Sequence, residues 1–443
     1  METLRYCLPP SVRRTLDELP ESLDGTYERV LREIKKPNRD HARRLLQCLV
    51  VAVRPLRVEE LAEVLAVDFD DDEGIPKLKT NWRWEDQEQA LLTSCSSLIV
   101  IVKSDGSRFV QFSHFSVKEF LTAARLATSS EDTSRYHILL KPAHTILAQA
   151  CLSVLLRVDD RVEQSGGNNS PLAKYAAQHW VAHAQDEKVS SCLRKAMEIL
   201  FDLDKPYFAA WLKSHDIDTN SSIDSIFYQF TPWHTSKATP LYYAALCGFQ
   251  DLVEHLTAND PKQVNATGGY YLTPLVAALA AGHFQTAKFL GDNGAQPDVR
   301  GYEEMTPLLS AAYNGDFEVV QVLLKYKADI NSRNTHGKTA LHLASKGDTR
   351  TDPKDPHIAS SLSKVARLLL EHGADVNDRA NDQSTPLHLA VKLGRVEVVQ
   401  VLLQHGANVG AKDDNGRTAS QIEVESNENR DEIMKLLSEH PAG

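Results

Sequence analysis

The stretch TPLHLAVKLG at 385–394 decides the fold of the C-terminal half of this 443-residue chain. Its first two residues predict a helix that begins at Pro386, because the Thr385 hydroxyl can cap a free backbone N–H and proline at the first helical position loses a donor that had no partner. Gly394 supplies the tight or left-handed backbone that ends such a helix. A second helix should follow, since valines and leucines then recur at the spacing of one helical face.

The same arrangement recurs along the whole second half of the chain. The capping threonines are Thr239, Thr273, Thr306, Thr339, Thr385 and Thr418, with successive separations of 34, 33, 33, 46 and 33 residues. The long interval contains an insertion of 13 residues near 347–361, which is rich in Asp, Thr and Pro and is predicted to form an exposed loop between the two helices of the fourth unit. No single unit can bury its helix pair alone, so the repeat predicts a solenoid that is stable through stacking.

These segments resemble the ankyrin-repeat family, through T-P-L-H-x-A at 385–390 and G-A-D-V-N at 373–377, with about six units at 235–440. The resemblance implies an extended concave surface, built from turn tips and first helices, that binds another protein. Tyrosine is enriched at interface hot spots. The predicted partner-binding residues are therefore Tyr243, Tyr270, Tyr271, Tyr302 and Tyr313. For each of them, packing between units is the alternative.

The first half of the chain shows a different pattern. Apolar periodicity predicts helices over 41–53, 58–67 and 85–95, and the segments 97–102 and 108–112 flank an Asp-Gly pair that is typical of a tight hairpin turn. Ser116 and Glu119 have the spacing of a capping box and should open a helix at 117–126. Three helices and a hairpin predict a small winged-helix domain at 39–130. The predicted fold class is thus mostly α, an ankyrin solenoid preceded by a helical linker and a winged helix with a β-hairpin.

Three stretches of this half resemble the winged-helix and linker region of NACHT-type STAND ATPases, in particular NACHT–ankyrin proteins similar to NOD-like receptors. They are LPESLDGTYERVLREI at 19–34, FSHFSVKEFLTAA at 112–124 and SPLAKYAAQHWVAHA at 170–184. The resemblance implies a helical tail of a NACHT-like module at 1–38, and a helical linker with an N-terminal cap at 131–234. It also implies that the signature histidine, here His114, contacts a nucleotide diphosphate when a NACHT module is supplied; without that module, His114 is interpreted as a helix-start residue.

The nucleotide-binding module itself has no counterpart in the sequence. A phosphate site needs a glycine-rich loop of the form G-x-x-x-x-G-K-[ST]. The single Gly-Lys-Thr, at 337–339, has Ser332 at the position of the first glycine and lies inside a repeat turn. No resident cofactor is therefore expected, and a NACHT domain becomes a possible partner of the N-terminal half.

Charge and composition exclude other classes of function. The formal net charge of −11 and the acidic start of the third winged-helix segment, Glu85-Asp86-Gln87-Glu88, disfavour nucleic acid, so a DNA-binding regulator is a minor alternative. Apolar runs are too short for a membrane span, and the first residues lack a secretory signal, which predicts a cytoplasmic location. The six cysteines are widely spaced with no C-x-x-C pair, so neither a disulfide framework nor a zinc cluster is expected.

No residue cluster in the sequence predicts catalysis or a metal site. His179 and His183 lie one helical turn apart, but Trp180 stands where a metalloprotease needs Glu. The acidic run from Asp68 begins like a calcium loop, yet Glu73 replaces the required glycine. The sequence therefore predicts a non-enzymatic protein-interaction module, either the sensor part of a NACHT–ankyrin signalling protein or a freestanding scaffold.

Overall fold

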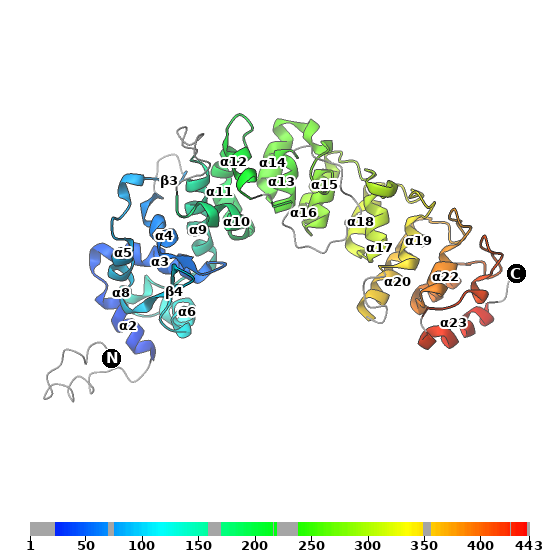
Figure 1. Cartoon of the computed structure of the whole chain (residues 1–443), viewed down its shortest axis with the longest axis horizontal. Coiled ribbons are helices and arrows are strands. Elements are labelled where there is room, and N and C mark those ends of the chain that lie inside the picture. The colour runs from blue at the N-terminus through cyan, green and yellow to red at the C-terminus, as the bar shows by residue number, and fades with distance from the viewer. Residues whose placement is uncertain are drawn as a thin grey trace. The chain divides into compact units, whose positions relative to one another are not determined.

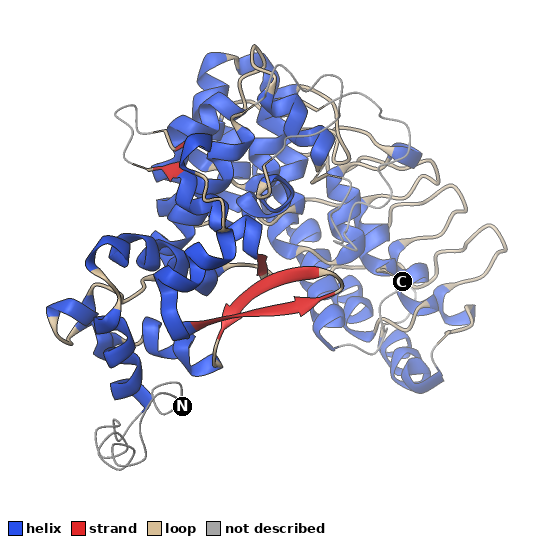
Figure 2. Cartoon of the chain, turned by 60° about the vertical axis from the view of Figure 1, so that its left-hand side comes forward, coloured by secondary structure: helices blue, strands red, loops and turns tan. Residues whose placement is uncertain are grey.

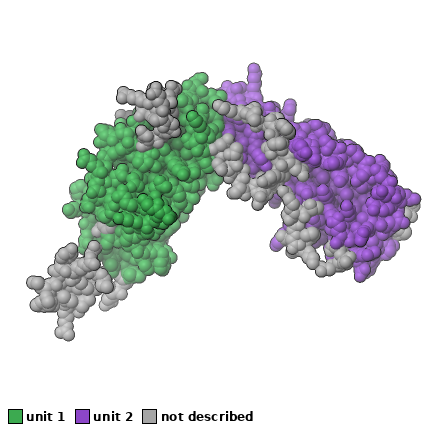
Figure 3. Space-filling model, viewed as in Figure 1, with its two compact units in different colours: residues 1–217 green, residues 218–443 purple. Residues whose placement is uncertain are grey.

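The computed structural model describes residues 23–69, 75–157, 170–215, 217–218, 238–348, 356–425 and 427–440. The chain divides into two compact units, residues 1–217 and 218–443 (Figures 1 and 3). The first unit contains helices and one small three-stranded sheet, and the second unit is built of helix pairs. The mostly helical fold predicted from the sequence is confirmed. Residues 219–237 lie outside the described ranges, so the domain boundary predicted at 234–235 stays a prediction.

The predicted winged helix is present in the first unit. Its helices are α3 (Arg39–Val51), α4 (Val58–Glu63) and α5 (Gln87–Cys95), and its strands are β1 (Leu56–Arg57), β4 (Ile99–Ser104) and β5 (Ser107–Phe112). The strands form an antiparallel sheet in the order β1-β5-β4, and Figure 2 shows the long hairpin of β4 and β5. Asp105 and Gly106 at its turn both have positive φ, 49° and 73°, as a tight hairpin turn requires. Strand β1 was missed because two residues carry no periodicity.

The start of helix α6 (Phe115–Thr122) differs from the prediction. His114 is the N-cap, since its Nδ1 accepts a hydrogen bond from the Ser116 N–H at 3.3 Å. The predicted cap at Ser116 is therefore wrong: the imidazole takes that role two residues earlier, and the Ser116 hydroxyl instead bonds the Tyr27 hydroxyl of α2 (Leu23–Glu33) at 2.8 Å. The predicted single helix at 117–126 is also interrupted, because Ala123 is extended and α7 (Ala124–Ala127) starts after it.

Five further helices and a short strand pair complete the described part of the first unit. They are α8 (Glu131–Ser134), α9 (Leu140–Leu155), α10 (Ala173–Ala184), α11 (Glu187–Leu200) and α12 (Tyr207–Ser214), and strands β2 (Val67–Asp68) and β3 (Lys77–Leu78) make a short separate pair. Trp180 of α10 and Trp211 of α12 are buried edge to face, with ring centroids 5.3 Å apart. Phe201 and Phe208 complete this aromatic core.

His179 and His183, which lie one turn apart on α10, both contact Tyr175 of the same helix. The His183 Nδ1 is hydrogen-bonded to the His144 Nδ1 at 2.9 Å, and its Nε2 to the Tyr175 hydroxyl at 2.8 Å. Burial, followed by the charges of His144 and His179, lowers the pKa of His183 to about 4. Within the described residues, no group of three or more His, Cys, Asp or Glu side chains could hold a metal ion. Asp70 and Asp72, in the acidic run that begins at Asp68, lie outside the described residues.

The second unit is a row of helix pairs. The first helices of successive repeats are α13 (Pro240–Cys247), α15 (Pro274–Ala280), α17 (Pro307–Asn314), α19 (Ala340–Lys346) and α21 (Pro386–Lys392). The second helices are α14 (Gln250–Asn259), α16 (Phe284–Asp292), α18 (Phe317–Lys325), α20 (Pro356–Glu371) and α22 (Val396–Gln404), and α23 (Asn427–Glu439) belongs to the sixth repeat. No described helix in either unit is both long and apolar enough to cross a membrane.

The insertion in the fourth repeat is only partly as predicted. Residues 356–361, which were expected to be loop, form the first turns of α20, so this helix has 16 residues where α18 and α22 have 9. Pro356 stands at the first helical position, where its missing N–H costs nothing. Residues 349–355 lie outside the described residues.

Candidate functional site

The helices of the repeats are held by caps that also reach the next repeat. In repeat 4 the Thr339 hydroxyl is bonded to His342 Nδ1 at 2.8 Å, and the His342 Nε2 lies 3.1 Å from the Ser384 carbonyl oxygen of repeat 5. His388 makes the same pair of contacts, to Thr385 at 2.8 Å and to the Arg417 carbonyl at 3.2 Å. Both ring nitrogens of each histidine are thus used in hydrogen bonds that hold the repeats together.

The equivalent position in the first three repeats is occupied by other residues. Tyr242 also links its repeat to the next one, because its hydroxyl accepts a hydrogen bond from the Tyr271 N–H at 3.0 Å. The same hydroxyl donates to the Asp218 carboxylate at 2.5 Å. Val276 and Leu309 have no polar atom to offer. The first helices α15 and α17, which follow each other along the row, are also the neighbouring pair that packs least closely.

The turn tips between repeats form a continuous ladder. The backbone N–H groups of Thr335, Asn381 and Asp414 donate to the carbonyls of Glu303, His336 and Asp382 at 3.0, 3.1 and 3.2 Å, each in the preceding tip. The Arg333 guanidinium adds a bond to the Arg379 carbonyl at 2.9 Å, and Arg379 in turn reaches the Lys412 carbonyl at 2.9 Å. The tips of repeats 3 to 6 are thus a preorganised row rather than separate loops.

Gly337 gives a direct test of how tightly these tips pack. A Cβ on Gly337 would lie 2.2 Å from the Asn381 Oδ1, whereas one on Gly416, at the same turn position two repeats later, meets nothing within 4 Å. Both glycines have φ of +71°. We expect Gly416→Ala to lower the free energy of unfolding by about 1 kcal/mol from backbone strain alone, and Gly337→Ala by about 2 to 3 kcal/mol. Urea denaturation followed by circular dichroism measures both; equal losses would show that the tips yield easily.

Two of the five predicted tyrosines are buried. Tyr243 is 4 % exposed and Tyr271 is 0 % exposed, so both side chains pack inside the unit and neither presents a surface to a partner. A neighbouring tyrosine covers part of each ring: Tyr243 packs edge to face on Tyr242, and Tyr271 packs edge to face on Tyr270. Tyr270 is itself partly buried, and its N–H donates to Asp218 at 2.6 Å.

Tyr302 and Tyr313 remain accessible. Tyr302, at the tip before α17, is 50 % exposed. Tyr313, at the end of α17, is half-buried: its hydroxyl donates to the Asp348 carboxylate at 3.4 Å, and the Lys346 ammonium lies 5.6 Å from its ring centre. Tyr302 directly precedes Glu303, whose carboxylate is 3.9 Å from the Nε2 of the exposed His336.

Lysines on the same side were not predicted. Lys346 and Lys392 follow Thr339 and Thr385 by seven residues, the position that Tyr313 holds after Thr306. The pKa of Lys338 is lowered, mainly because the side chain is buried. The carboxylate of Asp382 raises this pKa, and the positive charges of Lys346 and Lys392 lower it, so both lysines lie near Lys338. Aligning the repeats on their threonines would have revealed this column. We call the set of Tyr302, Tyr313, His336, Lys346 and Lys392 the tip–helix face.

His114, the nucleotide-contacting residue implied by the resemblance, is exposed at the start of α6. Its Nδ1 is 2.7 Å from the Ser116 hydroxyl, which links it to Tyr27. The Tyr27 ring also packs on Phe120, with centroids 5.4 Å apart. Two of the three stretches that carry the resemblance, around Tyr27 and around His114, therefore meet in space.

Comparison with protein-family models identifies both halves of the chain. Residues 27–131 match the model described as "GPI inositol-deacylase, winged helix domain". Residues 290–344 match "Ankyrin repeats (many copies)" and residues 357–443 match "Ankyrin repeats (3 copies)".

Curated relatives match different shares of this chain. "Azaphilone pigments biosynthesis cluster protein L" of Monascus ruber is 30% identical over 297 residues, which cover 63% of this chain and 61% of the relative. "Ankyrin repeat and SAM domain-containing protein 6" of Mus musculus is 35% identical over 107 residues, 23% of this chain and 12% of the relative. "Ankyrin repeat protein nuc-2" of Neurospora crassa is 29% identical over 107 residues, 24% of this chain and 10% of the relative.

The chain thus spans less than two thirds of each of these relatives, and only about a tenth of the latter two. The domain matches agree with the architecture seen in the coordinates, a sheet-bearing winged helix in the first unit and stacked helix pairs in the second. Ankyrin repeats are therefore present in the second unit, and the first unit contains a domain that matches the winged-helix model of GPI inositol-deacylase.

Proposed function

We propose that the repeats bind a partner protein through the tip–helix face, and that the partner presents an acidic segment next to an apolar anchor. Tyr302 is exposed at the tip before α17, and the half-buried ring of Tyr313 lies beside the Lys346 ammonium. Accessible tyrosines are typical of interface hot spots. The lysines would steer an acidic segment, and the tyrosine rings would cover the anchor. The observation that carries the proposal is the hydrogen-bonded ladder of tips, because a preorganised surface loses little entropy on binding.

The proposed role is binding without catalysis. The histidines best placed for chemistry in the repeats, His342 and His388, are buried and bonded on both ring nitrogens to neighbouring threonines and backbone carbonyls. We therefore expect substitutions on the tip–helix face to change the affinity for the partner protein, and we expect no effect on a catalytic rate.

A capture experiment with the full chain tests the proposed face. The double variant Tyr302→Ala/Lys346→Glu should weaken binding of the captured partner at least tenfold, about 1.4 kcal/mol or more. The control is Lys288→Glu, which reverses the charge of an exposed lysine on α16, the second helix of its repeat. This variant should bind the partner with an affinity within twofold of the wild type. Titration by surface plasmon resonance measures both, and equal affinities for the two variants would place the partner elsewhere.

We also propose that the first unit couples the repeats to a NACHT switch, as in a NACHT–ankyrin sensor. The contact between Tyr27 and Ser116 supports this, since it joins the two motifs that resemble that family, with His114 exposed beside them. Adding a separate NACHT module should then create a complex that retains ADP better than the module alone, and His114→Ala should remove the difference. A freestanding scaffold is the alternative, and a chain that neither associates with a NACHT domain nor alters its ADP retention would favour it.

A further inference from the structure

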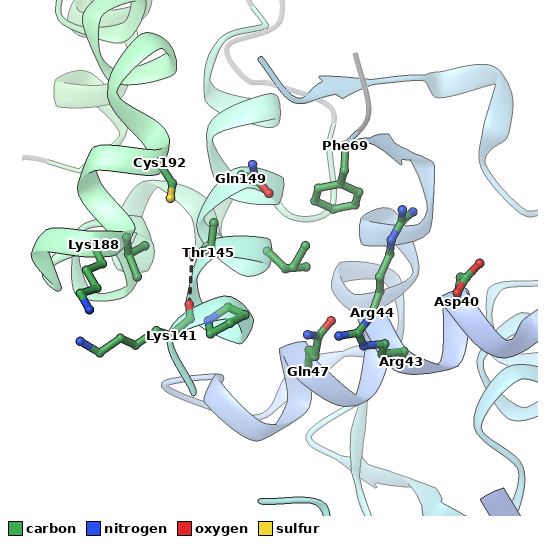
Figure 4. Close-up of a pocket in the computed structure, with 13 residues that line it drawn as sticks. Asp40, Arg43, Arg44, Gln47, Phe69, Lys141, Thr145, Gln149, Lys188 and Cys192 are labelled. Carbon is green, nitrogen blue, oxygen red and sulfur yellow. Dashed lines mark hydrogen bonds between the residues drawn. The ribbon is translucent and has the colours of Figure 1, made fainter. Parts of the chain in front are cut away.

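A pocket of about 690 Å³ lies in the first unit. It is bordered by α3, by the first turns of α9 and by α11, with Phe69 on a third side (Figure 4). Pro142, Ile146 and Val189 supply apolar lining. The volume is within the range of pockets that hold small organic molecules.

The charges around this pocket are mainly positive. Arg43, Arg44, Lys141 and Lys188 line it, against one acidic lining residue, Asp40. Arg44 lies over the Phe69 ring, 4.8 Å from its centre, and the Lys141 ammonium is paired with Asp186 at 2.8 Å. Arg43 and Lys188 have no ion-pair partner among the residues that the structure describes.

A buried polar group also faces this space. Gln47 lines the pocket from α3, and its side-chain amide has no hydrogen-bond partner within the described part of the chain. The amide atoms reach the pocket space, since they are not among the enclosed polar atoms that lack a partner, so water or a ligand can bond them. Gln149 and Thr145 line the pocket from α9, and the Thr145 hydroxyl donates to the Lys141 carbonyl (Figure 4).

We propose that this pocket binds a small organic anion, a carboxylate or phosphate group carried on an apolar body. The anionic group would pair with Arg43 and accept a hydrogen bond from the Gln47 amide, both on α3, while Lys188 on the opposite side of the pocket would add to the positive field that attracts it (Figure 4). The apolar body would lie against Ile146, Val189 and the Phe69 ring. This site is independent of the protein-binding face of the repeats, so either proposal can fail without the other.

The probe for this site is 1-anilinonaphthalene-8-sulfonate, an apolar body with one anionic group, compared with its uncharged relative N-phenyl-1-naphthylamine. The full chain should bind the sulfonate, and Arg43→Ala/Lys188→Ala should weaken that binding at least fivefold while binding of the uncharged probe changes less than twofold. Both substituted residues are exposed, so the fold is expected to persist. The control Lys174→Ala/Lys195→Ala removes two exposed cations that do not line the pocket and should bind like the wild type.

Cys192 reports whether the probe occupies this pocket. It lines the pocket and is exposed, whereas Cys48, Cys95, Cys151 and Cys247 are buried. In a Cys7→Ser background, saturating sulfonate should slow alkylation of Cys192 by N-ethylmaleimide at least fivefold, as measured by mass spectrometry. Absence of sulfonate binding, equal binding by both double variants, or binding that leaves the Cys192 rate unchanged would each overturn the proposal.

Discussion

Trp211→Ala is expected to lower the free energy of unfolding of the first unit by about 4 kcal/mol, the largest effect of any single substitution discussed for this chain. Trp211 is 1 % exposed, and its indole N–H donates to the Ala177 carbonyl at 3.1 Å. Its ring contacts Trp180 of α10 and Phe201 at the end of α11, with centroids 5.3 and 5.8 Å away. Truncation would leave a cavity among three helices and remove the hydrogen bond of the indole N–H.

The exposed Trp82 is the matched control. It is 48 % exposed, so Trp82→Ala should change stability by less than about 0.5 kcal/mol. Urea unfolding followed by circular dichroism, with hydrogen exchange of α10 amides to assign the transition to the first unit, measures both variants. A loss below about 2 kcal/mol for Trp211→Ala would show that the aromatic core collapses to fill the space.

Mild acid is expected to destabilise the first unit by about 3 kcal/mol between pH 6.5 and pH 4. Burial lowers the pKa of His183 in the folded state to about 4, while the ordinary value is 6.5. Over this window the unfolded chain binds a proton at His183 that the folded unit does not, so stability is fully present above pH 6.5 and is lost as the pH falls. Burial lowers the pKa of His144 as well, which adds to the same trend.

Variants in each unit separate the contributions. His183→Gln should start less stable at pH 7 but lose less stability on acidification, and urea midpoints at pH 7, 6, 5 and 4.5 measure the slope. In the second unit, burial lowers the pKa of His342 to about 4 and raises the pKa of Asp316 to about 6. Because the folded unit gains a proton at Asp316 as pH falls, the two shifts oppose each other. Asp316→Asn should therefore make the second unit more acid-sensitive; an unchanged slope would contradict this assignment.

Local sequence patterns were sufficient where the residues act on their own neighbours. The Thr–Pro starts predict where α13, α15, α17 and α21 begin, because capping and the conformation of proline depend only on adjacent backbone. Asp105 and Gly106 predict the hairpin turn for the same reason. The cap of α6 was misassigned because His114 and Ser116 can both cap the same helix, and the hydroxyl of Tyr27, 89 residues away, engages Ser116.

The candidate sites depended on contacts that no local pattern contains. Tyrosines 243, 271, 302 and 313 look alike in the sequence, but stacking of the repeats buries the first two and leaves the others accessible. The basic pocket between α3, α9 and α11 arises only when residues far apart in the chain are brought together, whereas alignment of the repeats would have revealed Lys346 and Lys392. The sequence by itself determined that this chain forms stacked ankyrin repeats and a winged helix, since caps, turns and periodicity are short-range properties. Which side chains face water was decided by tertiary packing, because burial is a property of neighbouring elements rather than of the residue.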